Sequence, residues 1–466
     1  MNKQNDRRDS AFFGHPVGLG WLSGSEFWER FSYYGMATLL VLYMTHSLLH
    51  TGHVENVFGF APFRRMLEWA YGPLSPQALA SAIYGLYAGL VYVTPIGGGI
   101  LAERFLGRTS TVTIGAGLMA VGHFLMAFDQ SFLLALFCLL IGVGCFKGNI
   151  VTQVGDLYGP DDPRRADAFQ IYFLGIQLAV IGSPLICGTL GETVGWHWGF
   201  GAAGVGMVIG LAIYLLGRPT FPPERPLRKK NDAPARPPLT GSEWRNIAIL
   251  LILIPVLAVA TVGNQEIFNA YLVWAEKTYR LAVFAFPVPV TWLISLDSIV
   301  STLTMALVIL FWRWWATRRA EPDELTKIII GTALGALAPL MLVAASAIFA
   351  ASGQRVSLGW AVAFEILNDL GFANVFPVGL ALYSRASPKG TAGIMIPLYY
   401  LHLFMGNMLV GRLGGFLERM PATSFWLMHA GLMAGAVALF LAVRFSVGRA
   451  LSPAYEGPAL AAETPA

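Results

Sequence analysis

The chain has 466 residues, of which 55% are hydrophobic and only 12% are charged, and its mean hydropathy is +0.59. A soluble globular domain carries about 25% charged residues, so this composition excludes a soluble domain and predicts a protein that crosses a membrane repeatedly. The formal net charge of +4 is small, and the basic residues are spread along the chain, which excludes a nucleic-acid partner.

Apolar runs long enough to cross a bilayer recur along the whole chain. One helical crossing needs about 20 residues, and the polar, basic start of the chain is not expected to be a secretory signal. We predict an all-α membrane protein with twelve transmembrane helices. Their expected ranges are 18–49, 77–102, 109–128, 131–156, 166–189, 195–217, 245–275, 287–315, 326–351, 356–384, 390–417 and 423–447.

The first of these helices contains three charged residues, Glu26, Glu29 and Arg30. Charges are costly inside a bilayer and usually mark a pathway for ions, protons or substrate. The i,i+3 and i,i+4 spacings place the three side chains on one helix face. We interpret them as part of a buried functional site. The alternative is a helix end whose charges extend into the headgroup zone.

A short glycine-rich turn, residues 97–108, is predicted between the second and third helices. Glu103, Arg104 and Arg108 of this turn can cap and bridge neighbouring helix ends. We interpret them as a gating latch that stabilises one transport state at the membrane surface. The alternative is a charged exit loop without a gating role.

Lys147 lies within the fourth predicted helix, where a lysine needs an acidic partner or a water-filled cavity. Glu26 and Glu29 are the nearest logical partners. Such a set can work as a proton switch. With both carboxylates ionised, Lys147 and Arg30 are held in ion pairs. Protonation of one glutamate frees a cation, which can then bind an anionic group of the substrate.

Residues 218–244 are rich in proline and basic residues, and they form the one clear linker. We expect residues 1–217 to form a bundle of six helices, residues 245–450 a second bundle, and residues 451–466 a tail. Lys and Arg concentrate in the segments that this plan places on one side, which the positive-inside rule assigns to the cytoplasm with both termini. Six helices plus six is the plan of major facilitator transporters, whose substrate site lies between the halves.

Catalytic, cofactor and metal motifs are not found within the predicted helices. Cys138, Cys145 and Cys187 suggest neither a disulfide framework nor a metal site, and HExxH, GxGD and GxSxG patterns are lacking. We therefore expect a protein that is not an enzyme and has no cofactor or metal. Its energy must come from an ion gradient, and protons are favoured over sodium because a set of Glu, Arg and Lys titrates.

Four sequence motifs together resemble one known family. They are ExxERFxYYG at residues 26–35, FKGNI, GDLYGPDDPRR, and PLICGTLGETVGWHWGFGAAGVGM at residues 184–207. The combination resembles the proton-dependent oligopeptide transporter (POT) family of the major facilitator superfamily, also called the peptide transporter family. The resemblance implies the major facilitator fold and the inward symport of protons with di- and tripeptides or peptide-like molecules. It also implies a multi-pass monomer in the cell membrane.

For the first half of the chain, the resemblance implies roles for individual residues. One set matches the family's residues for proton coupling and carboxylate binding, and a set of tyrosines matches its substrate pocket. For the tyrosines, packing between helices is the alternative. The matching residues are Glu26, Glu29, Arg30 and Lys147 for the charges, and Tyr33, Tyr34 and Tyr87 for the pocket.

The chain departs from the family at charged and polar pocket positions, which involve the second half. The family usually has an Arg where this chain has Ala37, and the acidic partner of that Arg where it has Asn264. Losing both is physically consistent, because one buried charge left unpaired is strongly destabilising. The carboxylate that the family uses in its tenth helix to bind an amino group is replaced by Phe372, and Gln177 stands for the usual Asn of the fifth helix. We keep these pocket positions as expected substrate contacts.

Asp297 in the eighth predicted helix occupies a place where the family commonly has Asn. An acid lost at Phe372 and an acid gained at Asp297 suggest that Asp297 binds the cationic group of the cargo. Glu365 and Asp369 are alternative replacements. The alternatives are that Asp297 pairs with another group of the protein or that the cargo carries no amine. The cargo is therefore either a short peptide or another small carboxylate, such as a modified peptide or an amino-acid conjugate.

Overall fold

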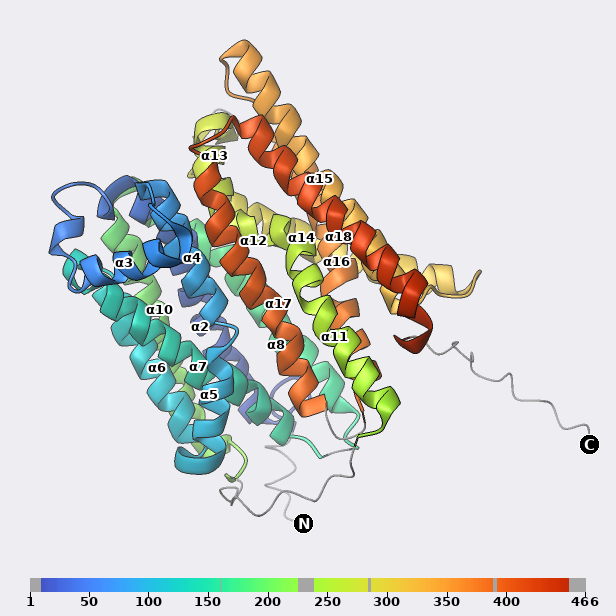
Figure 1. Cartoon of the computed structure of the whole chain (residues 1–466). Coiled ribbons are helices and arrows are strands. Elements are labelled where there is room, and N and C mark those ends of the chain that lie inside the picture. Colours follow the sequence, from blue (N-terminus) through green and yellow to red (C-terminus); the bar gives the residue numbers. More distant parts are fainter. Residues whose placement is uncertain (1–9, 160, 225–238, 284–285, 389–391, 452–466) are drawn as a thin grey trace, which may run out of the picture.

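The computed structural model of the protein describes residues 10–159, 161–224, 239–283, 286–388 and 392–451. Within these ranges the chain is helical almost throughout (Figure 1), and it contains one small antiparallel hairpin. Nearly all of the predicted tail and most of the predicted linker lie outside the described residues.

Within the described residues, helices make up most of each of the twelve predicted apolar segments, which confirms the all-α prediction. In the first half the elements are α2 (Val17–Tyr43), η1 (Met44–Leu48), η2 (Val54–Asn56), α3 (Phe60–Tyr71), α4 (Pro76–Leu90), α5 (Thr94–Leu101), η3 (Ala102–Leu106), α6 (Arg108–Leu125), η4 (Asp129–Ser131), α7 (Phe132–Asp156), α8 (Arg164–Ser183), η5 (Pro184–Gly188), α9 (Thr189–Thr193), α10 (Trp196–Gly217) and η6 (Arg218–Thr220). In the second half they are α11 (Gly241–Ala260), α12 (Val262–Gln265), η7 (Glu266–Phe268), α13 (Ala270–Thr278), β1 (Ala282–Val283), β2 (Phe286–Pro287), α14 (Trp292–Ala316), α15 (Glu324–Ser352), α16 (Gly359–Ala386), α17 (Ala392–Leu413), η8 (Gly414–Phe416) and α18 (Ala422–Leu451).

Several helix starts follow local signals in the sequence. Thr240 caps α11 in a reciprocal capping box with Glu243. The Asp323 side chain accepts a hydrogen bond from the Thr326 backbone N–H at 2.8 Å and so caps α15. Such caps satisfy backbone donors that have no partner within the helix.

Two predicted boundaries differ from the structure. Residues 97–108 do not form a short turn, because the helix continues from α5 through η3 to Leu106. Gly107, with a φ of 76°, then turns the chain into α6, and a side chain would strain this backbone conformation. The predicted helix 245–275 is not continuous, since α11 ends at Ala260 and α13 begins at Ala270.

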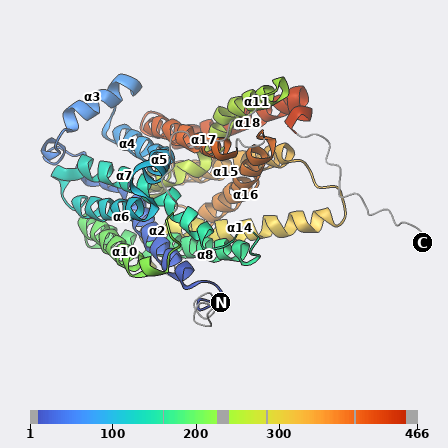
Figure 2. The ribbon, with the colours of Figure 1, turned by 90° about the horizontal axis from the view of Figure 1, so that it is seen from below.

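The helices of each half pack mainly on one another. In the first half α2 packs on α8 and α10, and α7 packs on α5 and α6; in the second half α15 packs on α16 and α18, and α11 on α17. The most extensive contacts between the halves are those of α4 with α17 and of α8 with α14. Figure 2 shows both junctions end-on, with the first half on one side of them and the second half on the other.

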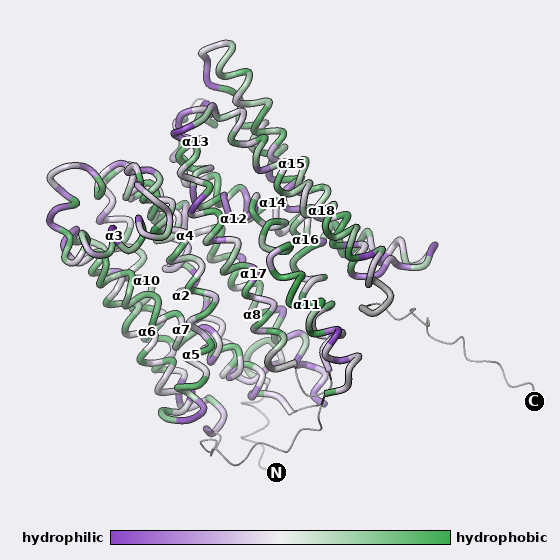
Figure 3. The backbone as a smooth tube through the Cα atoms, viewed as in Figure 1, coloured by the Kyte–Doolittle hydropathy of each residue, from purple (hydrophilic) through white to green (hydrophobic). Residues whose placement is uncertain are grey.

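The outer faces of the helices are apolar. Phe137, Leu216 and Leu303 are among the large apolar side chains with more than half of their surface exposed, and apolar residues predominate along the long helices in Figure 3. Nine helices in the described part of the chain are long and apolar enough to cross a membrane. Such faces are stable next to lipid rather than water, so the protein is a multi-pass membrane protein.

The helix α3 was not predicted. It follows the first long helix and presents Trp69 (89% exposed) and Met66 (51% exposed) on its surface, while Leu67 is buried against the protein. With only twelve residues it is too short to cross a bilayer. We call its end of the molecule the α3 side, and the opposite end, where the linker joins, the linker side.

The two halves touch most closely toward the α3 side. Arg412 Nη1 donates to the Tyr71 carbonyl at 2.5 Å, and His46 Nε2 lies 2.9 Å from Glu276 Oε2. The helices α4 and α17 cross with almost no space, since a Cβ atom on Gly85 would lie 2.6 Å from the Gly411 Cα. In the described part of the chain, each hydrogen bond or ion pair between the halves lies on the α3 side or near mid-depth.

Candidate transport site

Arg30 lies between two glutamates on α2. Its Nη2 donates to Glu29 Oε1 at 2.6 Å, its Nε contacts Glu29 Oε2, and the same Nε lies 3.2 Å from Glu26 Oε1. All three residues are at most 3% exposed. The three side chains therefore meet inside the protein, as their spacing predicted, and the alternative of exposed charges at a helix end is wrong.

The second carboxylate oxygen of Glu26 is different. Glu26 Oε2 is buried and has no hydrogen-bond partner, whereas both oxygens of Glu29 are engaged by Arg30. The buried hydroxyl of Tyr172, on α8, interacts with Glu26 and likewise has no partner within hydrogen-bond distance. A proton on Glu26 would supply a donor at an unsatisfied position, whereas a proton on Glu29 would disturb the Arg30 pair.

Lys147 does not pair with Glu26 or Glu29, contrary to the prediction. In the part of the chain that the structure describes it makes no ion pair within 4.0 Å, and its Nζ instead lies 5.1 Å from the centroid of the Tyr92 ring. The reason is geometric, because the planar guanidinium of Arg30 binds a carboxylate through two parallel hydrogen bonds. Lys147 still interacts electrostatically with the charges of α2. Its ammonium is thus held near the cluster by a cation–π contact.

The predicted pocket tyrosines surround the Arg30 cluster. The Tyr33 ring lies 5.2 Å from the Arg30 guanidinium and meets the Tyr34 ring edge-on at 5.1 Å. Tyr34 reaches across to the Phe268 ring of the second half at 6.0 Å. The Tyr87 hydroxyl is buried without a hydrogen-bond partner. The rings of these tyrosines can therefore pack between helices, while their hydroxyl groups can make polar contacts with a bound molecule.

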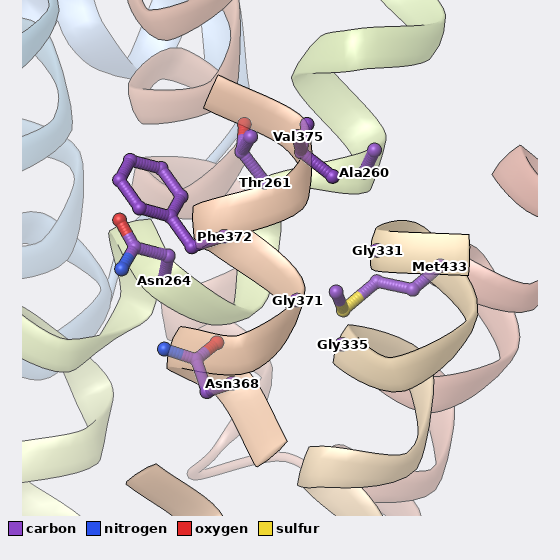
Figure 4. Close-up of a pocket in the computed structure, with 10 residues that line it drawn as sticks. All are labelled: Ala260, Thr261, Asn264, Gly331, Gly335, Asn368, Gly371, Phe372, Val375 and Met433. Carbon is purple, nitrogen blue, oxygen red and sulfur yellow. The ribbon is translucent and has the colours of Figure 1, made fainter. Parts of the chain in front are cut away.

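The second half contains a small pocket between α11, α12, α15, α16 and α18 (Figure 4). Asn264 and Phe372 lie side by side in it, together with Asn368. Phe372 also stacks on Phe376, with ring centroids 5.2 Å apart. The two positions at which the chain lacks the family's carboxylates are therefore neighbours, and the pocket residues around them carry no charge.

Acidic residues gather instead toward the α3 side of the same half. Asp297 on α14 and Glu365 and Asp369 on α16 each place a carboxylate oxygen within 4.8 Å of the other two. Glu365 and Asp369 are at most 1% exposed, and their four oxygens have no hydrogen-bond partner. We call these three residues the acidic triad. The sequence offered them as alternatives, and the structure brings all three together.

The other predicted site residues lie outside both the Arg30 cluster and the acidic triad. Gln177 Nε2 donates to Thr302 Oγ1 at 2.9 Å and so joins α8 to α14. Of the predicted latch, Arg108 pairs with Asp156 at the end of α7. Glu103 and Arg104 are exposed and form no ion pair with any described residue. A latch role for these two residues stays a prediction.

One buried pair of ionisable side chains was not predicted. Glu266 Oε2 lies 3.5 Å from His429 Nε2, and the His429 Nδ1 is 2.9 Å from the Phe425 carbonyl. The residues are 163 positions apart in the chain, so no local pattern connects them. The only sequence signal for this pair is that a Glu and a His each lie within an apolar segment.

The chain is similar to transporters of one family. A family model described as the POT family matches residues 109–235. The di-/tripeptide transporter of Lactococcus lactis subsp. cremoris is 30% identical, covering 96% of this chain and 86% of the relative. The peptide transporter YePEPT of Yersinia enterocolitica is 27% identical, covering 87% of this chain and 88% of the relative. A crystal structure of a mutant POT peptide transporter in complex with alafosfalin matches with a TM-score of 0.80 and 25% identity, covering 97% of this chain and 99% of that one.

The fold and the buried charges define a membrane transporter of the major facilitator type, not an enzyme. At 30% identity over most of both chains, the likeness establishes more than a shared fold. The protein belongs to the POT family.

Proposed function

We propose that this protein is a proton-coupled symporter that imports di- and tripeptides or peptide-like molecules by alternating access. The observation that carries the proposal is the buried Glu26–Glu29–Arg30 cluster with the unpaired Lys147 nearby. Buried ionisable residues in membrane helices typically form proton and substrate pathways. The names of the relatives, a di-/tripeptide transporter and a peptide transporter, support the cargo class.

The proposal includes an orientation in the cell membrane. The positive-inside rule places both termini and the linker in the cytoplasm, so the α3 side faces outward. Residues 1–217 and 245–450 are the two bundles that move against each other, and residues 218–244 connect them. The contacts between the halves on the α3 side then close the outer entrance in this structure. The transporter works as a monomer in the bilayer, without a cofactor.

The charge cluster supplies the switch. With both glutamates ionised, Arg30 is held by Glu29 and Glu26, and only Lys147 is available to a cargo carboxylate. A proton on Glu26 removes one of the two negative charges that hold Arg30. The summed charge of Glu26, Glu29, Arg30 and Lys147 then rises from 0 to +1, so a cargo carboxylate binds more tightly. A membrane potential of 100 mV supplies about 2.3 kcal/mol for each proton that enters.

The second half contacts the rest of the cargo. We propose that Asp297 attracts its cationic group, with Gln177, Asn264 and Phe372 as neutral contacts. Since Asn264 and Phe372 put no charge in the pocket of Figure 4, a second candidate cargo is a small carboxylate whose amino group is modified or missing. The same transport mechanism serves both cargo classes.

Purified protein in liposomes with an imposed pH gradient tests the function. We expect uptake of dialanine that is driven by external acid, and Glu26→Gln should abolish this driven uptake while retaining exchange of cargo across the membrane. Accumulation that does not depend on external pH would contradict proton coupling. A panel of dialanine, N-acetylated dipeptides and simple acids in the exchange assay then distinguishes the two cargo classes.

A further inference from the structure

The acidic triad differs from the other buried charges of the protein because no cation accompanies it. In the described residues no Lys, Arg or His lies within 4.0 Å of the three carboxylates. The titratable groups that interact with the triad from neighbouring elements are tyrosines, which are neutral. Tyr271 of α13 and Tyr279, directly after α13, interact with Glu365, and Tyr34 of α2 interacts with Asp297.

Three carboxylates in such a place cannot all be ionised. Like charges a few ångströms apart inside a protein force at least one group to keep its proton, as in the paired carboxylates of aspartic proteases. Burial acts in the same direction, because both oxygens of Glu365 and of Asp369 lack hydrogen-bond partners and water contact. An ammonium group of the cargo at Asp297 would compensate only one of the three charges.

An independent observation indicates that the acidic triad binds a ligand. The Tyr271 hydroxyl is fully buried, faces Glu365 and has no partner within hydrogen-bond distance. Around it are the rings of Phe364, Trp274 and Trp426, with centroids 5.1 to 6.4 Å from that of Tyr271. A metal ion such as Ca²⁺ prefers six or more oxygen ligands, whereas this aromatic wall supplies few. A proton needs no further ligands.

We propose that Asp297, Glu365 and Asp369 form a second proton-binding site, which holds at least one proton while the α3 side is closed. The site lies between the closed α3 side and the pocket of Asn264 and Phe372, because Glu365 and Asp369 precede Phe372 on α16. Opening of the α3 side admits water, which stabilises the ionised carboxylates and releases the proton. A ligand shifts a conformational equilibrium by its difference in affinity for the two states, so proton binding here favours closure of the α3 side.

The coupling role of this site rests on the proposed proton symport, but proton binding itself does not. Infrared spectroscopy of the purified protein detects the C=O band of protonated carboxyl groups at neutral pH. The triple variant Asp297→Asn, Glu365→Gln, Asp369→Asn is isosteric with the protonated triad, so it should fold and should lose part of this band. The exposed Asp167→Asn is the matched control, and its band should equal that of the wild type. Equal bands in the wild type and the triple variant would overturn the proposal, as would a wild-type band that disappears on addition of Ca²⁺ or Na⁺.

Accumulation in liposomes tests the coupling. Each coupled proton supports about tenfold accumulation at a gradient of one pH unit, because a tenfold concentration ratio is the free-energy equivalent of one pH unit. The double variant Glu365→Gln, Asp369→Asn retains Asp297 and should accumulate cargo about tenfold less at equilibrium. Unchanged accumulation would overturn the coupling role of the triad. Wild-type protein without any driven accumulation would instead contradict the proposed function, while the infrared result would still report on the triad.

Discussion

The charge cluster of the first half and the acidic triad of the second half compensate buried negative charge in different ways. Arg30 accompanies two glutamates and contacts both, so it compensates one of their two negative charges without a bound proton. The triad has three acids and no cation beside it among the residues that the structure describes, so it needs protons or a bound cation. The comparison shows that the number of buried acids says little about chemistry until the buried bases beside them are counted.

The largest effect is expected at the only cation within the first cluster. Arg30→Leu leaves Glu26 and Glu29 buried without a partner, which should destabilise the protein by about 3–5 kcal/mol and abolish uptake. Thermal unfolding in detergent and liposome uptake measure the two effects. Arg30→Lys is the control, since it keeps the charge but loses the two parallel hydrogen bonds to Glu29, and should recover part of the stability. A stable, active Arg30→Leu protein would mean that the cluster is protonated like the triad.

Substitution of Lys147, in contrast to Arg30, should change cargo binding and not stability. Its ammonium makes no ion pair among the described residues, so Lys147→Leu should not lower the unfolding temperature, while cargo affinity should fall about 10- to 100-fold through loss of a charge-assisted contact worth about 1.5–3 kcal/mol. Binding of dialanine to the purified protein measures the affinity. Lys147→Arg keeps a positive charge and should retain measurable binding. A large loss of stability in Lys147→Leu would show that Lys147 does pair with the glutamates in another state.

The substitution Asp297→Asn tests the acidic triad instead of the Arg30 cluster. We expect the exchange of dialanine to fall about tenfold, because an ionic contact with the amino group is lost, and the exchange of N-acetyldialanine to stay the same. Equal exchange of dialanine by the variant and the wild type would show that Asp297 does not bind the amine, and would leave the triad with its proton-binding role alone.

The smallest effect is expected at the contact between His46 and Glu276, which joins the halves on the α3 side. The hydrogen bond from His46 lowers the pKa of Glu276 below its ordinary value of 4.5. A carboxylate with a lowered pKa contributes stability that is fully present above about pH 4.5 and is lost as the pH falls through the lowered pKa. Glu276→Gln should therefore weaken closure of the α3 side by less than about 1 kcal/mol at neutral pH, since both side chains are partly exposed.

Spin-label distances across the α3 side measure this closure. The difference between Glu276→Gln and the wild type should disappear in acid below pH 4.5. The Glu55→Gln variant, which alters an exposed carboxylate in the loop before α3, is the control and should close like the wild type. A difference that persists unchanged in acid would show that Glu276 does not act through its charge.

The sequence by itself determined the membrane class, the helical nature of all twelve segments and the meeting of Glu26, Glu29 and Arg30. These features depend on local hydropathy and on spacing within one helix, which a linear sequence contains. The family followed from motifs that are also local. The breaks in the helix at Thr261 and Asn269 and the surface helix α3 were not predictable in this way, because packing against other segments overrides weak local preference.

Only the tertiary structure decided which distant charges meet. Lys147 faces Tyr92 rather than Glu26 or Glu29, Glu266 finds His429, and the three acids that the sequence offered as alternatives converge on one point. The rotation of each helix about its axis and the crossing of helices from both halves set these contacts, and neither is encoded in the spacing along one helix. Whether a buried charge finds an ionic partner or must keep a proton depends on the distances between side chains from different helices. Those distances are set only in the folded protein.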